Sequence, residues 1–209
     1  MPSATLPVPA ATASKKVSLK KARQAQCIYL KRRLIMSFHP WTHVQLGLWH
    51  KYPNPHCSHV ITVDVLDRSV DARTGIIRTE RILGCKQKAP VWILRLLGGS
   101  EDAFVREVMF VDPINQRTSI VSTNMSMSQY MTCLERIHYV PEPSRPLEKT
   151  LFSQAAEIQT RMPILKSLAN RLEQWSCERF GDNARLGRMG FEFVLRNLWE
   201  NRSIRQTEQ

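Results

Sequence analysis

The spacing of apolar residues changes twice along the chain, and each change predicts a different kind of element. From Trp41 to Leu48, apolar residues recur three or four positions apart, as on one face of a helix. Pro40 precedes this stretch. Proline is favoured at the start of a helix, because the backbone N–H groups of the first turn have no hydrogen-bond partner within the helix and the N–H that proline lacks is not missed. The two prolines of residues 52–55 follow it. The pattern therefore predicts a first helix that starts near Pro40 and stops by about Lys51.

Alternating apolar and polar residues then run through a series of short segments separated by turn residues. Alternation of this kind places successive side chains on opposite faces of a β-strand. The connections between most of these segments are short, which favours antiparallel pairing of neighbours. The predicted strands cover residues 59–68, 76–83, 103–112, 117–126, 130–140 and 150–160.

Helical spacing returns from about Pro163 to Asn201 and predicts a long C-terminal helix. Gly181, Gly187 and Gly190 interrupt this pattern, so we expect bends or close packing there. Strands first and a long helix last predict an α+β fold, in which helices cover one face of a curved antiparallel sheet. A long helix across a curved sheet can enclose a cavity instead of a solid core.

The segment between the second and third predicted strands, residues 89–103, is almost entirely apolar. Pro90 predicts the start of a short helix in it, and Gly98-Gly99 predicts its end. Two interpretations stay open: the helix is part of the core, or it is a lid whose apolar face covers a cavity and contacts a bilayer when open. The residues expected to make the lid and membrane contact are Val91, Trp92, Leu94, Leu96 and Leu97.

Positive charge is concentrated at the N-terminal end. The sequence has 30 Lys and Arg against 18 Asp and Glu, and nine of the basic residues lie in residues 1–63, where no acid occurs. The rest of the chain is nearly balanced. A basic arm leaves open a binding module for nucleic acid or other acidic surfaces. No apolar run approaches the roughly 18 residues of a membrane span, so we expect any membrane contact to be peripheral.

These patterns divide the chain into three parts. Residues 1–35 form a basic, acid-free extension, which is either a targeting segment or a solvated arm. Residues 36–203 form the patterned domain, and residues 204–209 form a tail. The five cysteines are widely spaced without a C-x-x-C pair, which favours isolated thiols over a disulfide framework.

A cluster of possible metal ligands follows the first predicted helix, with His56, Cys57 and His59 close together and His43 and His50 upstream. Tetrahedral zinc needs four convergent ligands, and no second pair with defined spacing accompanies this cluster. The cluster is better interpreted as a joint between a helix and a strand. We therefore expect no metal and no cofactor.

Arg179 lies on an apolar stripe of the C-terminal helix, where a charge is costly unless it is paired. One interpretation is an ion pair with a strand acid such as Glu107 or Glu135. The other is a guanidinium that recognises a phosphate. Lys86 and Lys88, just before the short helix, are either solvated or part of the same site.

Nine stretches, taken in order, resemble one known family. They are HPW (39–41), KYPNP (51–55), HVITVDVLDR (59–68), GIIRTERIL (75–83), PVWILRLLGG (90–99), VREVMFVDP (105–113), STNMS (122–126), EKTLFSQAAEI (148–158) and WSCERFGDNARLGRMGFEFVL (175–195). The chain resembles the PRELI family of mitochondrial phospholipid-transfer proteins, and its details are most similar to the slowmo-type branch.

This resemblance implies a curved seven-stranded antiparallel sheet that encloses a lipid cavity with a long C-terminal helix and a short lid helix, and a first strand near residues 28–37. It implies a peripheral membrane protein of the mitochondrial intermembrane space that is not an enzyme and binds no nucleic acid. The expected cargo is an anionic glycerophospholipid carried between the outer and inner membranes. Phosphatidylserine is favoured, and phosphatidic acid for cardiolipin synthesis is the alternative. The expected partner is a small helical protein with twin cysteine pairs.

The resemblance also assigns headgroup-binding residues. Four positions match basic residues of the family directly, while Lys86 stands beside a family lysine position occupied here by Cys85, and Arg185 retains one charge of a double-basic pair. The expected headgroup-binding residues are Lys51, His59, Lys86, Lys88, Arg179 and Arg185.

Overall fold

The computed structural model describes residues 26–28, 32–36, 39–86, 88–96, 100–160 and 166–207. Within these ranges, six long strands follow one another in the sheet, each antiparallel to its neighbours in sequence. They are β3 (Val60–Val70), β4 (Ile77–Lys86), β5 (Asp102–Asp112), β6 (Arg117–Asn124), β7 (Met131–Pro141) and β8 (Thr150–Thr160). All six predicted strands are confirmed, with boundaries that differ by at most a few residues.

The outer edge of β8 carries two short strands in succession, β1 (Gln26–Ile28) and β2 (Arg32–Met36). The predicted count of seven strands is therefore wrong: the described part of the sheet has six long strands, and two short segments occupy the edge where one strand was expected. Ile28 and Arg32 are four positions apart in the sequence, whereas their partners on β8, Glu157 and Gln154, are three positions apart. This one-residue change of register divides the edge strand in two.

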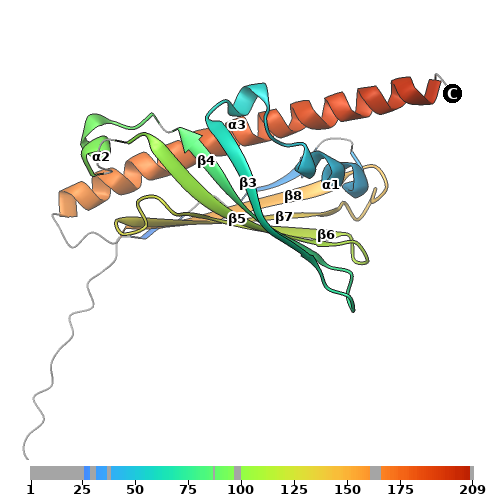
Figure 1. The fold of residues 1–209 in the computed structure, drawn as a ribbon, viewed down its shortest axis with the longest axis horizontal. Helices are drawn as coiled ribbons and strands as arrows, with labels where there is room; N and C mark the ends of the chain where they lie inside the picture. Colours follow the sequence, from blue (N-terminus) through green and yellow to red (C-terminus); the bar gives the residue numbers. More distant parts are fainter. Residues whose placement is uncertain are drawn as a thin grey trace, which may run out of the picture.

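The helices that the structure describes all lie on one side of the sheet. Figure 1 shows α3 (Lys166–Thr207) running across that face, with α2 (Val91–Leu96) near its first turns and α1 (Trp41–Trp49) toward its other end. A short 3-10 turn, η1 (Pro55–Cys57), follows α1 in the sequence and contacts α3. None of the described helices combines the length and apolarity that crossing a bilayer would need. The predicted α+β arrangement of helices on one face is confirmed.

Two apolar clusters fix α3 to the sheet, one toward each end. Near α1, Leu48 packs with Phe191 and Leu195 of α3 over β7 and β8. Near α2, Ile93 packs with Leu172 of α3 and with two sheet residues. Side chains of β8 alternate between buried and partly exposed from end to end, as the period-two pattern predicted. A cavity extends between the two clusters.

Close packing explains one of the three helix glycines. A Cβ on Gly190 would clash with Oδ1 of Asn54. That oxygen accepts hydrogen bonds from the backbone N–H groups of His56 and Cys57, both at 3.0 Å, and the Asn54 amide donates to the Lys51 carbonyl at 2.7 Å. Asn54 is therefore held rigidly, and only glycine lets α3 approach it. The expected close packing is confirmed at Gly190.

Candidate functional site

The cavity lies between the inner face of the sheet and α3, and its volume is about 270 Å³. On the α3 side it is lined from Trp175 to Phe191, which is about 24 Å along a helix. Near α2 its walls are apolar and include Ala89 and Phe180. Farther along α3 the walls carry most of the charged and polar side chains.

One row of polar side chains crosses the floor of the cavity. Arg81 of β4 is paired with Glu107 of β5, Glu107 with Ser122 of β6, and Ser122 with Glu135 of β7. Directly paired residues of neighbouring antiparallel strands share one face of the sheet. The register thus brings four polar residues from four strands into a single line on the concave face.

The first two members of this row form a buried ion pair. Arg81 and Glu107 are only 6% and 5% exposed. Nε and one terminal nitrogen of Arg81 lie 2.7 and 2.6 Å from the same oxygen of Glu107. Because each group neutralises the other, this pair contributes little net charge to the cavity. The ion pair considered between Glu107 and Arg179 is not formed, since Glu107 pairs with Arg81.

Glu135, at the other end of the row, has a different environment. Its carboxylate accepts a hydrogen bond of 2.5 Å from the Gln154 side-chain amide. The Gln154 carbonyl oxygen in turn lies 3.4 Å from a guanidinium nitrogen of Arg188 on α3. Burial raises the pKa of Glu135, although the Gln154 hydrogen bond and the charge of Lys51 act in the opposite direction.

Lys51 enters the cavity from the turn after α1. Its ammonium nitrogen lies 5.2 Å from the ring centre of Tyr52 and 5.8 Å from that of Phe191, so aromatic faces surround it. Burial alone would lower the pKa of Lys51, but Tyr52, Tyr139 and Glu107 outweigh burial, and the pKa is raised. Lys51 therefore stays charged in the cavity.

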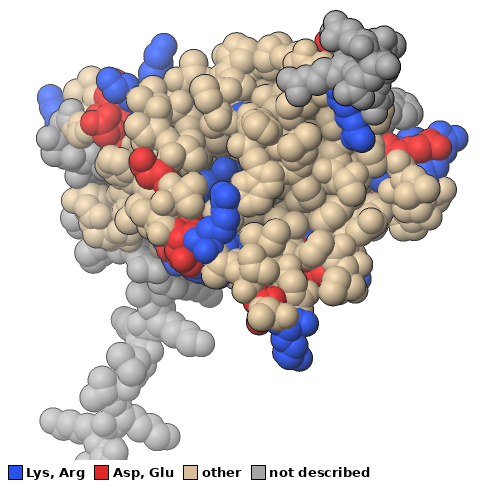
Figure 2. Space-filling view, turned by 45° about the vertical axis from the view of Figure 1, so that its right-hand side comes forward, with Lys and Arg blue, Asp and Glu red and all other residues tan. Residues whose placement is uncertain are grey.

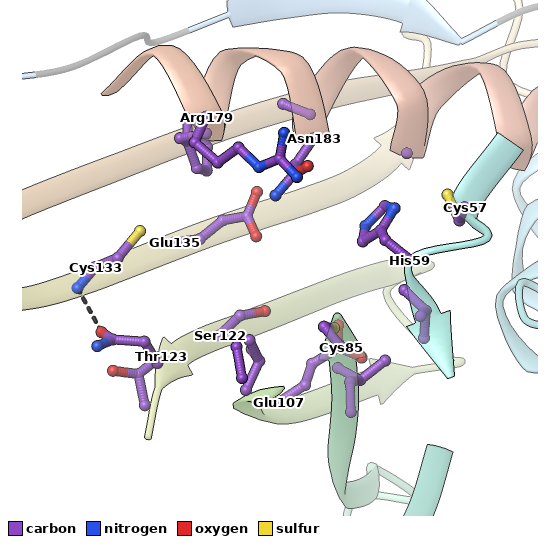
Figure 3. Close-up of a pocket in the computed structure, with 18 of the residues that line it drawn as sticks. Cys57, His59, Cys85, Glu107, Ser122, Thr123, Cys133, Glu135, Arg179 and Asn183 are labelled. Carbon is purple, nitrogen blue, oxygen red and sulfur yellow. Dashed lines mark hydrogen bonds between the residues drawn. The ribbon is translucent and has the colours of Figure 1, made fainter. Parts of the chain in front are cut away.

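His59, in the turn just before β3, and Arg179 of α3 face one another across the cavity. Figure 3 shows both side chains directed into it, together with Asn183 and Glu135. Burial, with a smaller effect of the Arg179 charge, lowers the pKa of His59. His59 is therefore a neutral imidazole near pH 7 in the absence of a ligand. A bound anion would favour its protonation.

The structure places three of the six expected headgroup residues in the cavity wall, namely Lys51, His59 and Arg179. Lys86 and Lys88 are exposed at the end of β4 and before α2. Arg185 is also exposed and lies 3.8 Å from Asp182, one turn earlier in α3. The structure therefore does not bring these last three side chains together with the first three.

The short helix α2 packs beside the apolar end of the cavity. Ile93 is fully buried there, against Met131, Ile158 and Leu172. Of the residues expected to make the lid contact, Val91 is 64% exposed, and Trp92 and Leu94 are partly buried. The side chain of Leu96 and the whole of Leu97 lie outside the described residues.

The possible metal ligands after α1 point to different neighbours. The His56 ring packs against Phe193 at 5.7 Å, the Cys57 thiol donates to the Leu186 carbonyl at 3.6 Å, and His59 faces the cavity. In the described ranges, no three His, Cys, Asp or Glu side chains are grouped to hold a metal ion.

Three of the cysteines are free thiols, Cys57, Cys85 and Cys133. Burial raises the pKa of Cys85 to about 11 and that of Cys133 to about 12, so both stay protonated at neutral pH. Cys177 is disulfide-bonded, and the expectation that every cysteine is an isolated thiol is wrong for it.

Several cavity residues were not identified from sequence as part of a site. A usable signal existed for the missed residues that lie in strands, because they occupy inward positions in an alternating pattern where an apolar residue is expected. In β4, for example, Arg81 stands between the inward residues Thr79 and Leu83. The cavity residues that were missed include Tyr52, Arg81, Ser122, Gln154 and Arg188.

Comparisons with known proteins identify relatives of this chain. The model of the PRELI-like family matches residues 43–201. The UPS-like protein C36.10 of Schizosaccharomyces pombe is 40% identical over 169 residues, which are 81% of this chain and 89% of that protein. Protein UPS2, mitochondrial, of Saccharomyces cerevisiae is 40% identical over 163 residues, which are 78% of this chain and 70% of that protein.

Among solved structures, the Zhui aromatase/cyclase from Streptomyces sp. R1128 superimposes with a TM-score of 0.53. The match covers 81% of this chain and 93% of that chain at 10% sequence identity. At this identity the likeness shows a shared fold and carries nothing about ligand or activity.

Proposed function

The chain belongs to the PRELI-like family, and on that basis we propose that it carries one anionic glycerophospholipid, with phosphatidylserine favoured, between the outer and inner mitochondrial membranes. It works in the mitochondrial intermembrane space and binds its cargo reversibly, without covalent chemistry. The observation that carries this proposal is one cavity with two kinds of wall. Lys51 and Arg179 supply positive charge to it, and the apolar part beneath α2 suits acyl chains.

The size of the cavity supports a role for α2 as a lid. At about 270 Å³ it lies just below the range of roughly 300–1,000 Å³ that is typical of drug-sized ligand sites. A diacyl phospholipid is larger than such ligands, so its chains need more space than this cavity gives. Movement of α2 provides that space at the apolar end. The exposed Val91 is then placed to meet the bilayer as the lid opens.

A small helical partner with twin cysteine pairs is part of the proposal. The described surface that best suits an apolar helix is β3, which pairs only with β4. Its apolar side chains Ile61, Val63, Val65, Leu66 and Val70 are 36–62% exposed. An uncovered edge strand of this kind favours association with another chain.

Two alternative functions have different degrees of support. Phosphatidic acid is a second candidate cargo, because Lys51 and Arg179 would also attract its phosphate. A binding module for nucleic acid receives less support. Figure 2 shows a face on which uncharged residues predominate and basic and acidic side chains are interspersed. A nucleic-acid site instead gathers Lys and Arg into a continuous patch.

The proposal is tested by lipid transfer between liposomes, using the full chain in complex with its partner. Labelled phosphatidylserine in donor liposomes should move to acceptor liposomes well above the rate without protein. Background rates for phosphatidylserine and phosphatidic acid alike would reject the proposal.

Arg179→Glu tests the charged part of the cavity. Reversing this charge should abolish lipid extraction, because the new carboxylate would repel the phosphate. The thermal unfolding midpoint should change little. Arg185→Glu is the matched control on the exposed face of the same helix. Unchanged extraction by Arg179→Glu would remove Arg179 from the site, and equal losses from both variants would argue that Arg185 also contacts the lipid.

A further inference from the structure

The polar row on the floor of the cavity is not balanced in charge. At one end, Arg81 and Glu107 form a compact pair that neutralises itself. At the other end, the Glu135 carboxylate accepts a hydrogen bond from Gln154, a neutral amide. In the described part of the chain, no Lys, Arg or His nitrogen lies within 4.0 Å of Glu135. The row therefore ends in a carboxylate that has no partner of opposite charge in contact.

Lys51 does not serve as that partner. It influences the charge of Glu135 through space, but its ammonium group is held among the Tyr52 and Phe191 rings. Burial raises the pKa of Glu135. The surrounding protein therefore stabilises the charged carboxylate less well than water does. A buried carboxylate is costly unless a cation or several hydrogen-bond donors accompany it. A ligand that brings a cation to Glu135 would remove this cost.

The position of Glu135 suits a ligand that carries both signs of charge. Figure 3 shows the carboxylate directed toward α3, on the side where Arg179 and Asn183 enter the cavity. Basic side chains from α3 and from the turn after α1 thus line the same space as an acidic side chain from β7. A headgroup that consists of a phosphate alone would use only the basic side chains and would be repelled by Glu135.

We propose that Glu135 accepts the ammonium group of the lipid headgroup and so selects aminophospholipids over phosphatidic acid. This inference rests on the proposed function, and it adds the residue that recognises the amine. Lys51 and Arg179 face the phosphate, while Glu135, fixed by Gln154, contacts the ammonium. The site takes headgroups in which an amine accompanies the phosphate, with the anionic phosphatidylserine first, and discriminates against headgroups without an amine.

Glu135→Gln tests this assignment with little change of shape. A glutamine at this position keeps an oxygen that accepts the Gln154 hydrogen bond, and it loses only the charge. Transfer by the partner-bound protein is measured from liposomes that contain labelled phosphatidylserine, phosphatidylethanolamine or phosphatidic acid. We expect transfer of both aminophospholipids to fall about tenfold or more, since a charge-assisted contact is lost. Transfer of phosphatidic acid should be retained or increased.

Glu178→Gln is the matched control, because Glu178 is exposed on α3 and contacts only the neighbouring Gln174 among the hydrogen bonds described. This variant should transfer all three lipids as the wild type does. A second measurement needs no variant: the wild-type protein should transfer phosphatidylserine with an acetylated amine at least about tenfold more slowly than phosphatidylserine itself.

Failure of this inference differs from failure of the proposed function. Equal losses for all three lipids in Glu135→Gln, or no loss for any, would overturn the role of Glu135 while wild-type transfer stands. Undiminished transfer of the acetylated lipid would overturn it as well, even if the variant does not fold. Background transfer of every lipid by the wild type would instead reject the proposed function.

Discussion

Gly187 faces the cavity from α3 with no atom within 4 Å of where its Cβ would lie. We predict that Gly187→Leu lowers lipid transfer at least about tenfold, because the new side chain occupies space needed by the ligand. The same change should stabilise the fold by up to about 1 kcal/mol, since glycine is a poor helix residue. Gly181→Leu is the control, because Gly181 also has an open Cβ position but is exposed to solvent. Equal transfer by both variants would show that the ligand does not pass Gly187.

A pH dependence of stability follows from His39. Burial, together with the charges of His43 and Arg196, lowers its pKa to about 4 from an ordinary 6.5. The unfolded chain therefore binds more protons than the folded chain between these values. Stability should fall as pH decreases from about 6.5 to 4.

Thermal unfolding across this pH range measures the effect. His39→Phe should flatten the dependence, whereas His138→Gln, at an exposed strand position, should leave it unchanged. An equally steep loss of stability in His39→Phe would show that another group is responsible.

Individual site residues were predicted from the sequence only where a local signal or the family resemblance marked them. Lys51 and His59 flank the turn after α1, and both line the cavity. On α3, the resemblance selected Arg185, whereas Arg188 lines the cavity. Three residues rotate a helix by about 300°, so the two arginines lie on different parts of its surface. Sequence spacing does not say which part faces the sheet.

At the scale of elements, Ile93 is the most deeply buried of the α2 side chains that the structure describes. Ile93 is fully buried against Leu172 and two sheet residues, and a helix of six residues is not stable alone. Ile93→Ala should remove about 2–5 kcal/mol of packing and let α2 open. Amide hydrogen exchange within residues 91–96 should accelerate, and bound lipid should be released faster.

Val91→Ala is the control for this prediction, because the Val91 side chain is mostly exposed and its truncation should leave hydrogen exchange unchanged. If Ile93→Ala instead accelerated exchange equally throughout the sheet and α3, α2 would be part of the general core and not a separate lid.

The long elements could be predicted from their periodicity, and the sheet edge could not. Each long strand has eight or more residues, and burial alternates along strands such as β6 and β8, which gives a signal that survives local irregularities. Strands β1 and β2 have three and five residues and differ in register by one against β8. The basic stretch that contains them does not alternate regularly, so it gives no count of the strands at this edge.

The function of the whole molecule depends on a cavity that single segments do not encode. Residues Arg81 and Glu135 are 54 positions apart and join one polar row only because three successive strand pairs have the right register. Alternation within a strand predicts which side chains point inward, but not which of them lie opposite one another. The family resemblance implied a lipid cavity, while the distribution of charge within it required the structure.

Lipid bound to the full chain and its partner, purified from mitochondria, tests the central claim most directly. Mass spectrometry of the extracted lipids should find about one glycerophospholipid per protein, with phosphatidylserine enriched relative to its share of the source membrane. The Glu135→Gln complex should lose this enrichment. Absence of bound phospholipid, or a mixture that matches the membrane composition, would contradict the claim that this cavity selects an anionic aminophospholipid.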